Sequence, residues 1–447
     1  MLSEERNRML TQVGPATPMG TLLRRYWMPV AGVSEFDSRS TTKPLRLLGE
    51  DLVLYKDLSG DFGLVDRRCP HRRADLAFGM VEKHGLRCNY HGWAFGNSGK
   101  CLAQPFEDTA YPERNTKDSI TIKSYPVQAK AGMLWAYLGP LPAPQLPDWE
   151  PFSWENCFAQ VVISELPCNW FQCQENSIDP VHFEWMHETW GKRLRTGDRS
   201  PVPTHLKLDF DEFEYGFTYR RIKENTDEAD EMWTVGRVCL WPNGFFLGEH
   251  FEWRVPIDDE NTLSVTWKVT KIPKDRHPFV QQSIPTWYGP LVDDEGKWID
   301  THVMNQDFLA WVGQGRIADR TQEHLGASDR GIVAIRRRFF EEMEAIAAGA
   351  EAKGTIRDPA RNVRVQQPMM DRERLLASIT VAEIEADPHK RRSYTSFIFQ
   401  AGQPEAVRQA FSAAMGIEAI EFDGLLQSRS VFKSAPDNHK ETPDEPA

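Results

Sequence analysis

The sequence predicts an α+β fold, with an all-β domain near the N-terminus and a larger α+β domain behind it. Two observations support this prediction. Short β-type runs dominate residues 44–141, whereas later residues mix strand-like runs with long amphipathic segments. Between the two regions, Pro142, Pro144 and Pro147 form a stiff, proline-rich stretch that is typical of a domain boundary.

The first domain is preceded by helical segments and is built from short strands. Residues 1–25 are expected to be helical, with a break from Gly14 to Pro18 and a second helix from Met19 to Tyr26. A turn at residues 49–51 joins two apolar runs, which indicates a hairpin. The strands expected here are residues 45–48, 52–55, 61–65 and 132–137.

The second domain combines strands with two clear helices. Residues 217–219 and 263–267 have the β-branched and aromatic enrichment of strands. Residues 329–350 place apolar side chains on one helical stripe, and residues 405–415 form a helix that Gly416 ends. The expected division is a helical segment at 1–26, domains at 27–146 and 147–430, and a polar tail at 431–447.

Composition and charge exclude several classes of protein. The 447 residues are 40% hydrophobic and 26% charged, which rules out a disordered chain. A net charge of −12 disfavours nucleic-acid binding, and no apolar run approaches the ~20 residues that cross a bilayer. The charged N-terminus does not resemble a signal peptide, and seven scattered cysteines favour reduced thiols. We therefore expect a soluble cytoplasmic protein that binds neither membranes nor nucleic acid.

Two close Cys/His pairs form the first candidate site. Cys69 and His71 are followed, after sixteen intervening residues, by Cys88 and His91. Four such ligands suit either a zinc ion or an iron–sulfur cluster. Each pair supplies one thiolate and one imidazole, an order that suits a [2Fe–2S] cluster with both thiolates on one iron and both imidazoles on the other.

A second candidate site lies about ninety residues later. His182 and His187 are five residues apart, a separation that converges on one metal where a helix is distorted or ends. Two imidazoles and one carboxylate on a single face leave coordination positions open for dioxygen, as in the facial triad of non-haem Fe(II) oxygenases. Such a pair alone is weak evidence, because two histidines at a helix end can have purely structural roles.

The two patterns together resemble those of Rieske non-haem iron aromatic ring-hydroxylating oxygenases. The resemblance rests on CPHR and CNYHGW, and on the pattern from Asn169 through Asp179 to His187. It extends from about residue 20 to 350 and favours the phthalate dioxygenase-like branch of terminal oxygenase α subunits. It implies an N-terminal β-rich Rieske domain and a catalytic domain with an antiparallel sheet flanked by helices, a helix-grip-like fold.

The resemblance also implies roles for particular residues. Asp179 would bridge His182 to His91 of a neighbouring subunit, which implies a homotrimer or hexamer, and Asn169 would lie beside the iron without binding it. The third iron ligand would be Asp307, because Asp307 and the later Gln314 match the family pattern. Asp300 and Glu323 are weaker candidates.

The implied protein is a terminal oxygenase of aromatic catabolism with one Rieske [2Fe–2S] cluster and one mononuclear Fe(II). Electrons would come from a separate NAD(P)H-dependent reductase of the flavin and ferredoxin type, since the chain has no Gly-rich nucleotide motif. The expected reaction uses O₂ to hydroxylate an aromatic substrate, with an aromatic carboxylic acid favoured. The alternative is O- or N-demethylation by a monooxygenase that acts on an aryl methyl ether or a related compound.

Two further hypotheses and a set of substrate contacts remain to be tested. A Rieske ferredoxin would be only about as long as the first domain, and a zinc-stabilised interaction protein would lack acid-labile sulfide. Aromatic side chains are expected to line the substrate pocket, and an inward arginine would bind a substrate carboxylate. The candidates are Trp170, Trp241, Phe245 and Phe246 for the pocket, and Arg220, Arg221, Lys223 and Arg237 for the carboxylate.

Overall fold

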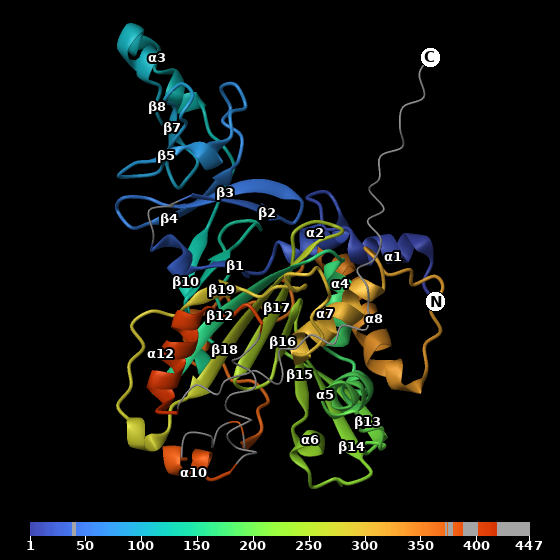
Figure 1. Ribbon diagram of the computed structural model, residues 1–447. Helices are drawn as coiled ribbons and strands as arrows, with labels where there is room; N and C mark the ends of the chain where they lie inside the picture. Colours follow the sequence, from blue (N-terminus) through green and yellow to red (C-terminus); the bar gives the residue numbers. More distant parts are fainter. Residues whose placement is uncertain (38–41, 372, 374–378, 388–400, 418–447) are drawn as a thin grey trace, which may run out of the picture.

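The computed structural model describes residues 1–37, 42–371, 373, 379–387 and 401–417. A β-rich N-terminal part stands above a large sheet, with helices α4, α7 and α8 at one end of that sheet and α12 beside β12 (Figure 1). This is the predicted order, an all-β domain followed by a larger α+β domain. The predicted boundary at 430 and the tail at 431–447 lie outside the described residues.

Two short helices precede the first strand, as predicted. α1 (Glu4–Thr11) is capped by Ser3, whose hydroxyl accepts from the Arg6 amide, and α2 (Pro18–Leu23) is capped by Thr17. The second helix ends at Leu23 instead of Tyr26. Both helices pack against the catalytic part of the chain, because the amide of Leu2 donates to the carbonyl of Arg320 at 3.0 Å and α2 contacts α8.

Three small antiparallel sheets form the N-terminal part. The predicted hairpin is confirmed, with Leu47 paired to Glu50 across the turn. The first sheet contains β1 (Met28–Gly32), β11 (Met133–Ala136) and β10 (Val127–Lys130). The second contains β2 (Thr42–Leu47), β3 (Glu50–Lys56), β4 (Phe62–Asp66) and β9 (Ser124–Tyr125). The third contains β5 (Met80–Val81), β6 (Leu86–Arg87), β7 (Ala94–Phe95) and β8 (Cys101–Ala103).

One eight-stranded sheet dominates the catalytic part. Its order is β13-β14-β15-β16-β17-β18-β12-β19, and all pairs are antiparallel except β12 with β19. The sheet is therefore antiparallel, as predicted, except at one edge, where β12 and β19 run parallel. The strands are β12 (Cys157–Leu166), β13 (His205–Phe213), β14 (Gly216–Lys223), β15 (Arg237–Leu240), β16 (Gly244–Phe246), β17 (His250–Pro256), β18 (Thr262–Lys271) and β19 (Thr286–Tyr288).

The predicted long helices are both present. α8 (Arg330–Ala347) occupies the predicted 329–350 segment, and α12 (Glu405–Met415) ends at Gly416, whose φ is +70°. The other α-helices are α3 (Pro105–Ala110), α4 (Trp170–Asn176), α5 (Gly191–Thr196), α6 (Glu231–Thr234), α7 (Val303–Gly313) and α10 (Val381–Glu385). The segments labelled η are short 3₁₀-helices, except for η6, which is a π-helix. They are η1 (Val33–Phe36), η2 (Leu76–Phe78), η3 (Pro112–Arg114), η4 (Thr116–Ser119), η5 (Glu150–Ser153), η6 (Phe183–Trp190), η7 (Lys274–Arg276), η8 (Ala327–Asp329) and η9 (Pro359–Arg361).

The proline-rich stretch between the two parts is packed against the catalytic part. Gln145 forms a β-bridge with Ile356, and Trp149 forms one with Val365. The Trp149 side chain belongs to the main core. The stretch is thus held in place along its length, and the boundary at residue 146 remains a prediction.

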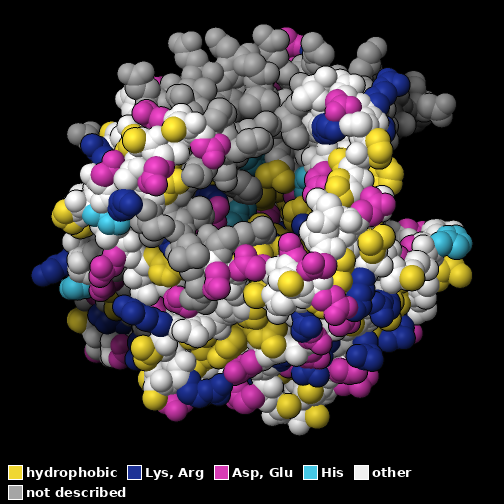
Figure 2. All heavy atoms as spheres, turned by 90° about the horizontal axis from the view of Figure 1, so that it is seen from below, with side chains coloured by type: hydrophobic (Ala, Val, Ile, Leu, Met, Phe, Trp, Pro, Cys, Tyr) yellow, Lys and Arg dark blue, Asp and Glu magenta, His cyan; other side chains and the backbone are white. Residues whose placement is uncertain are grey.

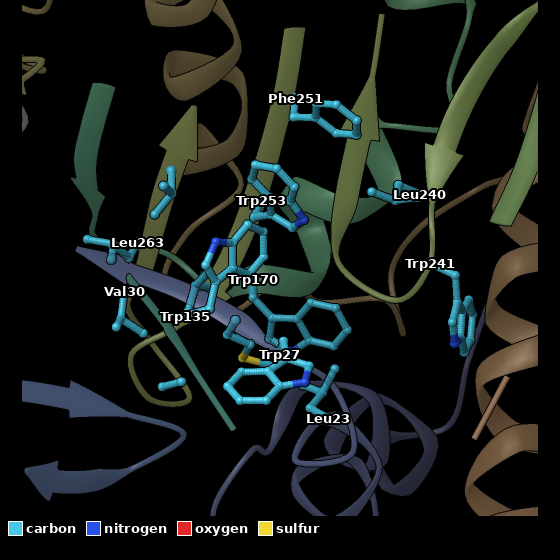
Figure 3. Close-up of a cluster of buried hydrophobic side chains, with 14 of the residues drawn as sticks. Leu23, Trp27, Val30, Trp135, Trp170, Leu240, Trp241, Phe251, Trp253 and Leu263 are labelled. Atoms are coloured by element: carbon cyan, nitrogen blue, oxygen red, sulfur yellow. The ribbon is translucent and has the colours of Figure 1, made fainter. Parts of the chain in front are cut away.

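The two faces of the large sheet differ in chemistry. Phe251, Trp253 and Val255 of β17 point into the main core, where Trp27 and Trp135 of the N-terminal part meet them (Figure 3). The alternate residues His250, Glu252 and Arg254 are also buried, but they lie on the opposite face. β18 repeats this pattern, with Leu263, Val265, Trp267 and Val269 in the core and Ser264, Thr266, Lys268 and Thr270 on the other face.

A buried polar face is unusual, because polar groups taken from water destabilise a fold unless they are paired. Here Arg254 pairs with Glu252 at 3.0 Å, and Lys268 pairs with Glu249 at 2.6 Å. The charged groups of this face are therefore stabilised by pairing with one another. Within the part of the chain that the structure describes, no helix is long and apolar enough to cross a membrane.

Candidate metal centres

His182 and His187 converge because the helix between them is a π-helix. η6 runs from Phe183 to Trp190, directly after His182. A π-helix has i→i+5 hydrogen bonds, so residues five apart lie above one another. The two imidazole rings accordingly lie 5.3 Å apart between centroids. The distortion that the His-x₄-His spacing required is thus present in the fold.

Asp307 on α7 completes the group. Its Oδ1 lies 3.3 Å from Nε2 of His187 and 3.7 Å from Nε2 of His182. Among the described residues, these three form the one set of His, Cys, Asp or Glu side chains whose donor atoms all lie within 4.8 Å of one another. The arrangement is two imidazoles and a carboxylate around a common point, which is the donor set of a non-haem iron site.

Neighbouring side chains orient the three donors. Nδ1 of His187 lies 3.0 Å from Oε1 of Gln306, which places the proton on Nδ1 and leaves Nε2 as a lone-pair donor. The amide of Asn176, at the end of α4, donates to Oδ1 of Asp307 at 3.3 Å. Asp179 lies behind His182, with its Oδ2 3.7 Å from Nδ1 of that ring.

The electrostatics fit a cation between these groups. Burial raises the pKa of the Asp307 carboxyl, but His187 and His182 outweigh it and hold this pKa below its usual value. Burial also raises the pKa of Asp179, and the adjacent His182 more than offsets it, so Asp179 is a carboxylate at neutral pH. Nε2 of His187 is buried and has no hydrogen-bond partner among the described residues, as expected for an atom that faces a metal ion.

The structure places Asn169 at the start of α4. Asn169 caps the start of α4, where its Oδ1 accepts from the Phe171 amide, and its Nδ2 donates to the carbonyls of Thr11 and Asp259. The amide beside the triad is Asn176, one helix length of about 10 Å further on. Of the weaker third-ligand candidates, Glu323 pairs with Arg336, and Asp300 is not part of the triad.

Removing the Gln306 side chain, which accepts a hydrogen bond from His187, should weaken metal binding. We expect Gln306→Leu to lower iron affinity about 10- to 100-fold, because the ring loses the group that fixes its tautomer and orientation. Iron retained after timed exposure to a chelator measures the effect. Gln306→Glu keeps an acceptor and should retain more iron than the Leu variant, whereas the exposed Gln314→Leu should match wild type. Equal iron loss from the Leu and Glu variants would contradict this role for Gln306.

The first candidate site consists of two loops with the same backbone geometry. The Cys69 amide donates to the carbonyl of Ala74, and the Cys88 amide donates to that of Trp93, at 2.9 and 2.8 Å. Four residues after each cysteine the chain adopts a left-handed conformation, at Arg73 (φ +59°) and Gly92 (φ +77°). Both loops therefore curl around their cysteine in the same way.

The four side chains suit a cluster better than a single ion. Cys69 and Cys88 are buried, whereas His71 and His91 are exposed and their rings lie 4.5 Å apart. No three of the four have donor atoms within 4.8 Å of one another, whereas the donors of His182, His187 and Asp307 all lie within that distance. A [2Fe–2S] cluster has two irons, one for the buried thiolates and one for the exposed imidazoles.

The structure separates the predicted pocket residues. Trp170, Trp241 and Phe246 lie in the main core. Contrary to the expectation from the sequence, they do not line the site. Phe245 points the other way from β16 and joins an apolar cluster with Tyr219, Met232 and Met370, against which Phe183 packs. Because neighbouring strand residues face opposite sides, Phe245 and Phe246 could not both line one pocket. The ring of Phe183 lies 4.5 Å from His182 and 5.1 Å from His187.

Carboxylate partners within the protein are present for Arg220, Lys223 and Arg237. Their pairs are Arg220 with Asp211, Lys223 with Glu188, and Arg237 with Glu373. Arg221 lies over the ring of Phe183, with its guanidinium 5.0 Å from the ring centroid. Figure 2 shows this end of the molecule hollowed near its centre, with hydrophobic, histidine and acidic side chains on the walls.

Two family models match the chain. A Rieske [2Fe-2S] domain matches residues 26–126, which contain both cysteine loops, and a domain described as LigXa C-terminal domain like matches residues 294–395, which contain Asp307.

Characterised relatives match most of the chain. The 5,5'-dehydrodivanillate O-demethylase oxygenase subunit of Sphingobium sp. (strain NBRC 103272 / SYK-6) is 60% identical over 93% of this chain and 98% of its own length. The phthalate 4,5-dioxygenase oxygenase subunit of Pseudomonas putida is 31% identical over 79% of this chain and 89% of its own. Among solved structures, the terminal oxygenase of carbazole 1,9a-dioxygenase from Novosphingobium sp. KA1 covers 75% of this chain and 96% of its own, with 20% identity and a TM-score of 0.51, which supports the fold.

Proposed function

Because the chain belongs to the Rieske oxygenases, as an oxygenase subunit, we propose that it O-demethylates an aromatic acid that carries a methoxy group. The observation that carries the proposal is the 60% identity, over nearly the whole length, to an oxygenase subunit named for O-demethylation. This is the alternative that the sequence analysis left open, and we prefer it to hydroxylation of the ring.

The proposed substrate is 5,5'-dehydrodivanillate, a biaryl of two 4-hydroxy-3-methoxybenzoate units, or a close analogue. The reaction converts one methyl ether, O₂, NAD(P)H and a proton into a phenol, formaldehyde, NAD(P)⁺ and water. Hydroxylation of the methyl carbon gives a hemiacetal, whose C–O bond then breaks to release formaldehyde. One oxygen atom of O₂ therefore leaves in formaldehyde and the other in water.

The donor sets described above would hold the two metal groups. His182, His187 and Asp307 would bind a mononuclear Fe(II), and Cys69, His71, Cys88 and His91 would bind the [2Fe–2S] cluster. When bound, the cluster supplies electrons and the mononuclear iron supplies O₂ chemistry. The residues of the chain hold these groups and orient their surroundings: Gln306 fixes the tautomer of His187, and the carboxylate of Asp179 lies 3.7 Å from Nδ1 of His182.

The shape of the chain supports an assembly of several subunits. The exposed His71 and His91 belong to the β5–β8 end of the molecule, which projects away from the large sheet (Figure 1). Asp179 keeps 27% of its side chain exposed beside His182. We infer a homotrimer or hexamer in which the β5–β8 end of one subunit meets the Asp179 surface of the next.

As a Rieske oxygenase subunit, the protein works with a separate electron-donating partner. We propose that this partner is an NAD(P)H-dependent reductase of the flavin and ferredoxin type. A cytoplasmic location is also proposed, and the seven free cysteines support it because reduced thiols are typical of that compartment.

The test is product analysis with ¹⁸O₂. The holoenzyme, supplied with a surrogate reductase, is given a panel of methoxylated aromatic acids and phthalate. We expect the methoxylated biaryl to yield formaldehyde and, in equal amount, a phenol that has lost one methyl group and carries no label. A cis-dihydrodiol with two labelled oxygens, from phthalate or any panel member, would overturn demethylation in favour of ring dioxygenation.

A further inference from the structure

Tyr219 lies in the apolar cluster that borders the candidate iron site. It is on β14, and its side chain is completely buried among Met232, Phe245 and Met370. Phe183 packs against this cluster and also contacts both histidines of the triad. Through Phe183, the cluster therefore lies next to the metal donors and gives that side of the site an apolar character.

The side chain of Tyr219 adds one polar group, its hydroxyl, to this apolar cluster. The hydroxyl has no hydrogen-bond partner among the described residues. A buried hydroxyl without a partner destabilises a fold by ~1–3 kcal/mol. Phenylalanine would fill the same space without that loss. Because the described residues supply no partner, the hydroxyl here is free to bond a group that enters the site.

The surroundings keep this hydroxyl in its donor form. Burial is the largest influence on its acidity, and it raises the pKa of Tyr219 to about 12, although the charges of Arg221 and Arg237 act in the opposite direction. Asp179 also contributes to raising it, which places the hydroxyl within electrostatic range of the carboxylate behind His182. Tyr219 is thus a neutral phenol at any pH where the protein works.

We propose that the Tyr219 hydroxyl donates a hydrogen bond to an oxygen substituent of the substrate ring and so selects methoxylated or hydroxylated rings and sets their position beside the iron. The inference deepens the proposed function and rests on it. The oxygen is either the methoxy oxygen or the neighbouring phenol, since both offer the same acceptor chemistry. A purely apolar pocket discriminates such substituents poorly, whereas a site built to bond an oxygen rejects the analogue that lacks it.

The test compares Tyr219→Phe with wild type as holoenzymes without oxygen, by calorimetric titration with the proposed biaryl. We expect about tenfold weaker binding, equivalent to ~1.4 kcal/mol. The melting temperature should be unchanged or higher, because an unpaired hydroxyl has been removed from an apolar site. Analogues that lack either the phenol or the methoxy oxygen identify the acceptor. The analogue that lacks the oxygen bonded by Tyr219 should bind equally well to the variant and to wild type.

Tyr137→Phe is the matched control. Tyr137 is also fully buried, but its hydroxyl donates to the carbonyl of Pro140 at 3.0 Å. Its variant should melt at a lower temperature and bind the biaryl as wild type does. The proposal is overturned if Tyr219→Phe binds the biaryl normally, or if it loses as much stability as Tyr137→Phe. If wild type neither binds nor demethylates any methyl ether, the proposed function fails instead.

Discussion

Asp179→Asn should retain both metal centres and lose about 100-fold or more of its turnover with the native electron donor. The carboxylate lies 3.7 Å from Nδ1 of His182 and is ionised at neutral pH, so it places a negative charge beside that ring. An amide at the same position carries no charge and can present its NH₂ to the ring. In our assembly, the variant also loses the acceptor that links His182 to the next subunit.

The readouts separate this role from a structural one. Iron and acid-labile sulfide per chain should equal those of wild type, and the cluster should still be reduced by dithionite at the normal rate. Oxidation of the reduced cluster in a single turnover with substrate and O₂ should be slowed as much as turnover. Asp211→Asn is the matched control, because this exposed acid pairs with Arg220 on the surface and surface pairs contribute little. Wild-type turnover in Asp179→Asn would refute the bridging role.

The convergence of the proposed metal donors is largely predictable because their spacing is local. Cys69, His71, Cys88 and His91 belong to two tight loops, and each loop needs only a few residues to set its geometry. His182 and His187 share one distorted helix, so their separation of five already contains the signal. Asp307 came from a family pattern, and the fold brings it from α7 to the two histidines.

The residues around the metal are predictable only in part, because tertiary contacts select them. Asn169 and Asn176 both belong to the same motif, and the sequence does not show which end of α4 faces the triad. Gln306 precedes Asp307 directly, yet its bond to His187 depends on how α7 meets η6. The available signal for Gln306 was its position, because it is an amide residue directly next to a predicted ligand.

The prediction of the pocket residues failed for a different reason. Trp170 and Trp241 have the apolar surface that a pocket needs, but a core needs the same surface, and composition does not separate the two. Trp170 packs edge-on against Phe339 of α8, and Trp241 stacks on the same ring. The faces of β16 to β18 decide which aromatic residues line the site, and that choice appears only once the strands are paired.

Asp307→Ala should lose nearly all mononuclear iron while the cluster remains. It removes one of three protein donors, and the change should lower iron affinity by more than the 10- to 100-fold effect of losing an outer partner. Iron per chain should therefore fall from three to about two, with two acid-labile sulfides and the visible spectrum of the cluster unchanged. Demethylation should fall to background, because the remaining imidazoles cannot hold the metal.

Asp300→Asn decides whether that loss is specific to Asp307. Both carboxylates are buried near α7, and one oxygen of Asp300 has no partner among the described residues, so burial alone does not distinguish them. Geometry does, since only Asp307 lies within 3.7 Å of both ring nitrogens. The Asp300 variant should keep three irons per chain. Full iron in Asp307→Ala with depletion in Asp300→Asn would move the third ligand to the start of the helix and refute the triad.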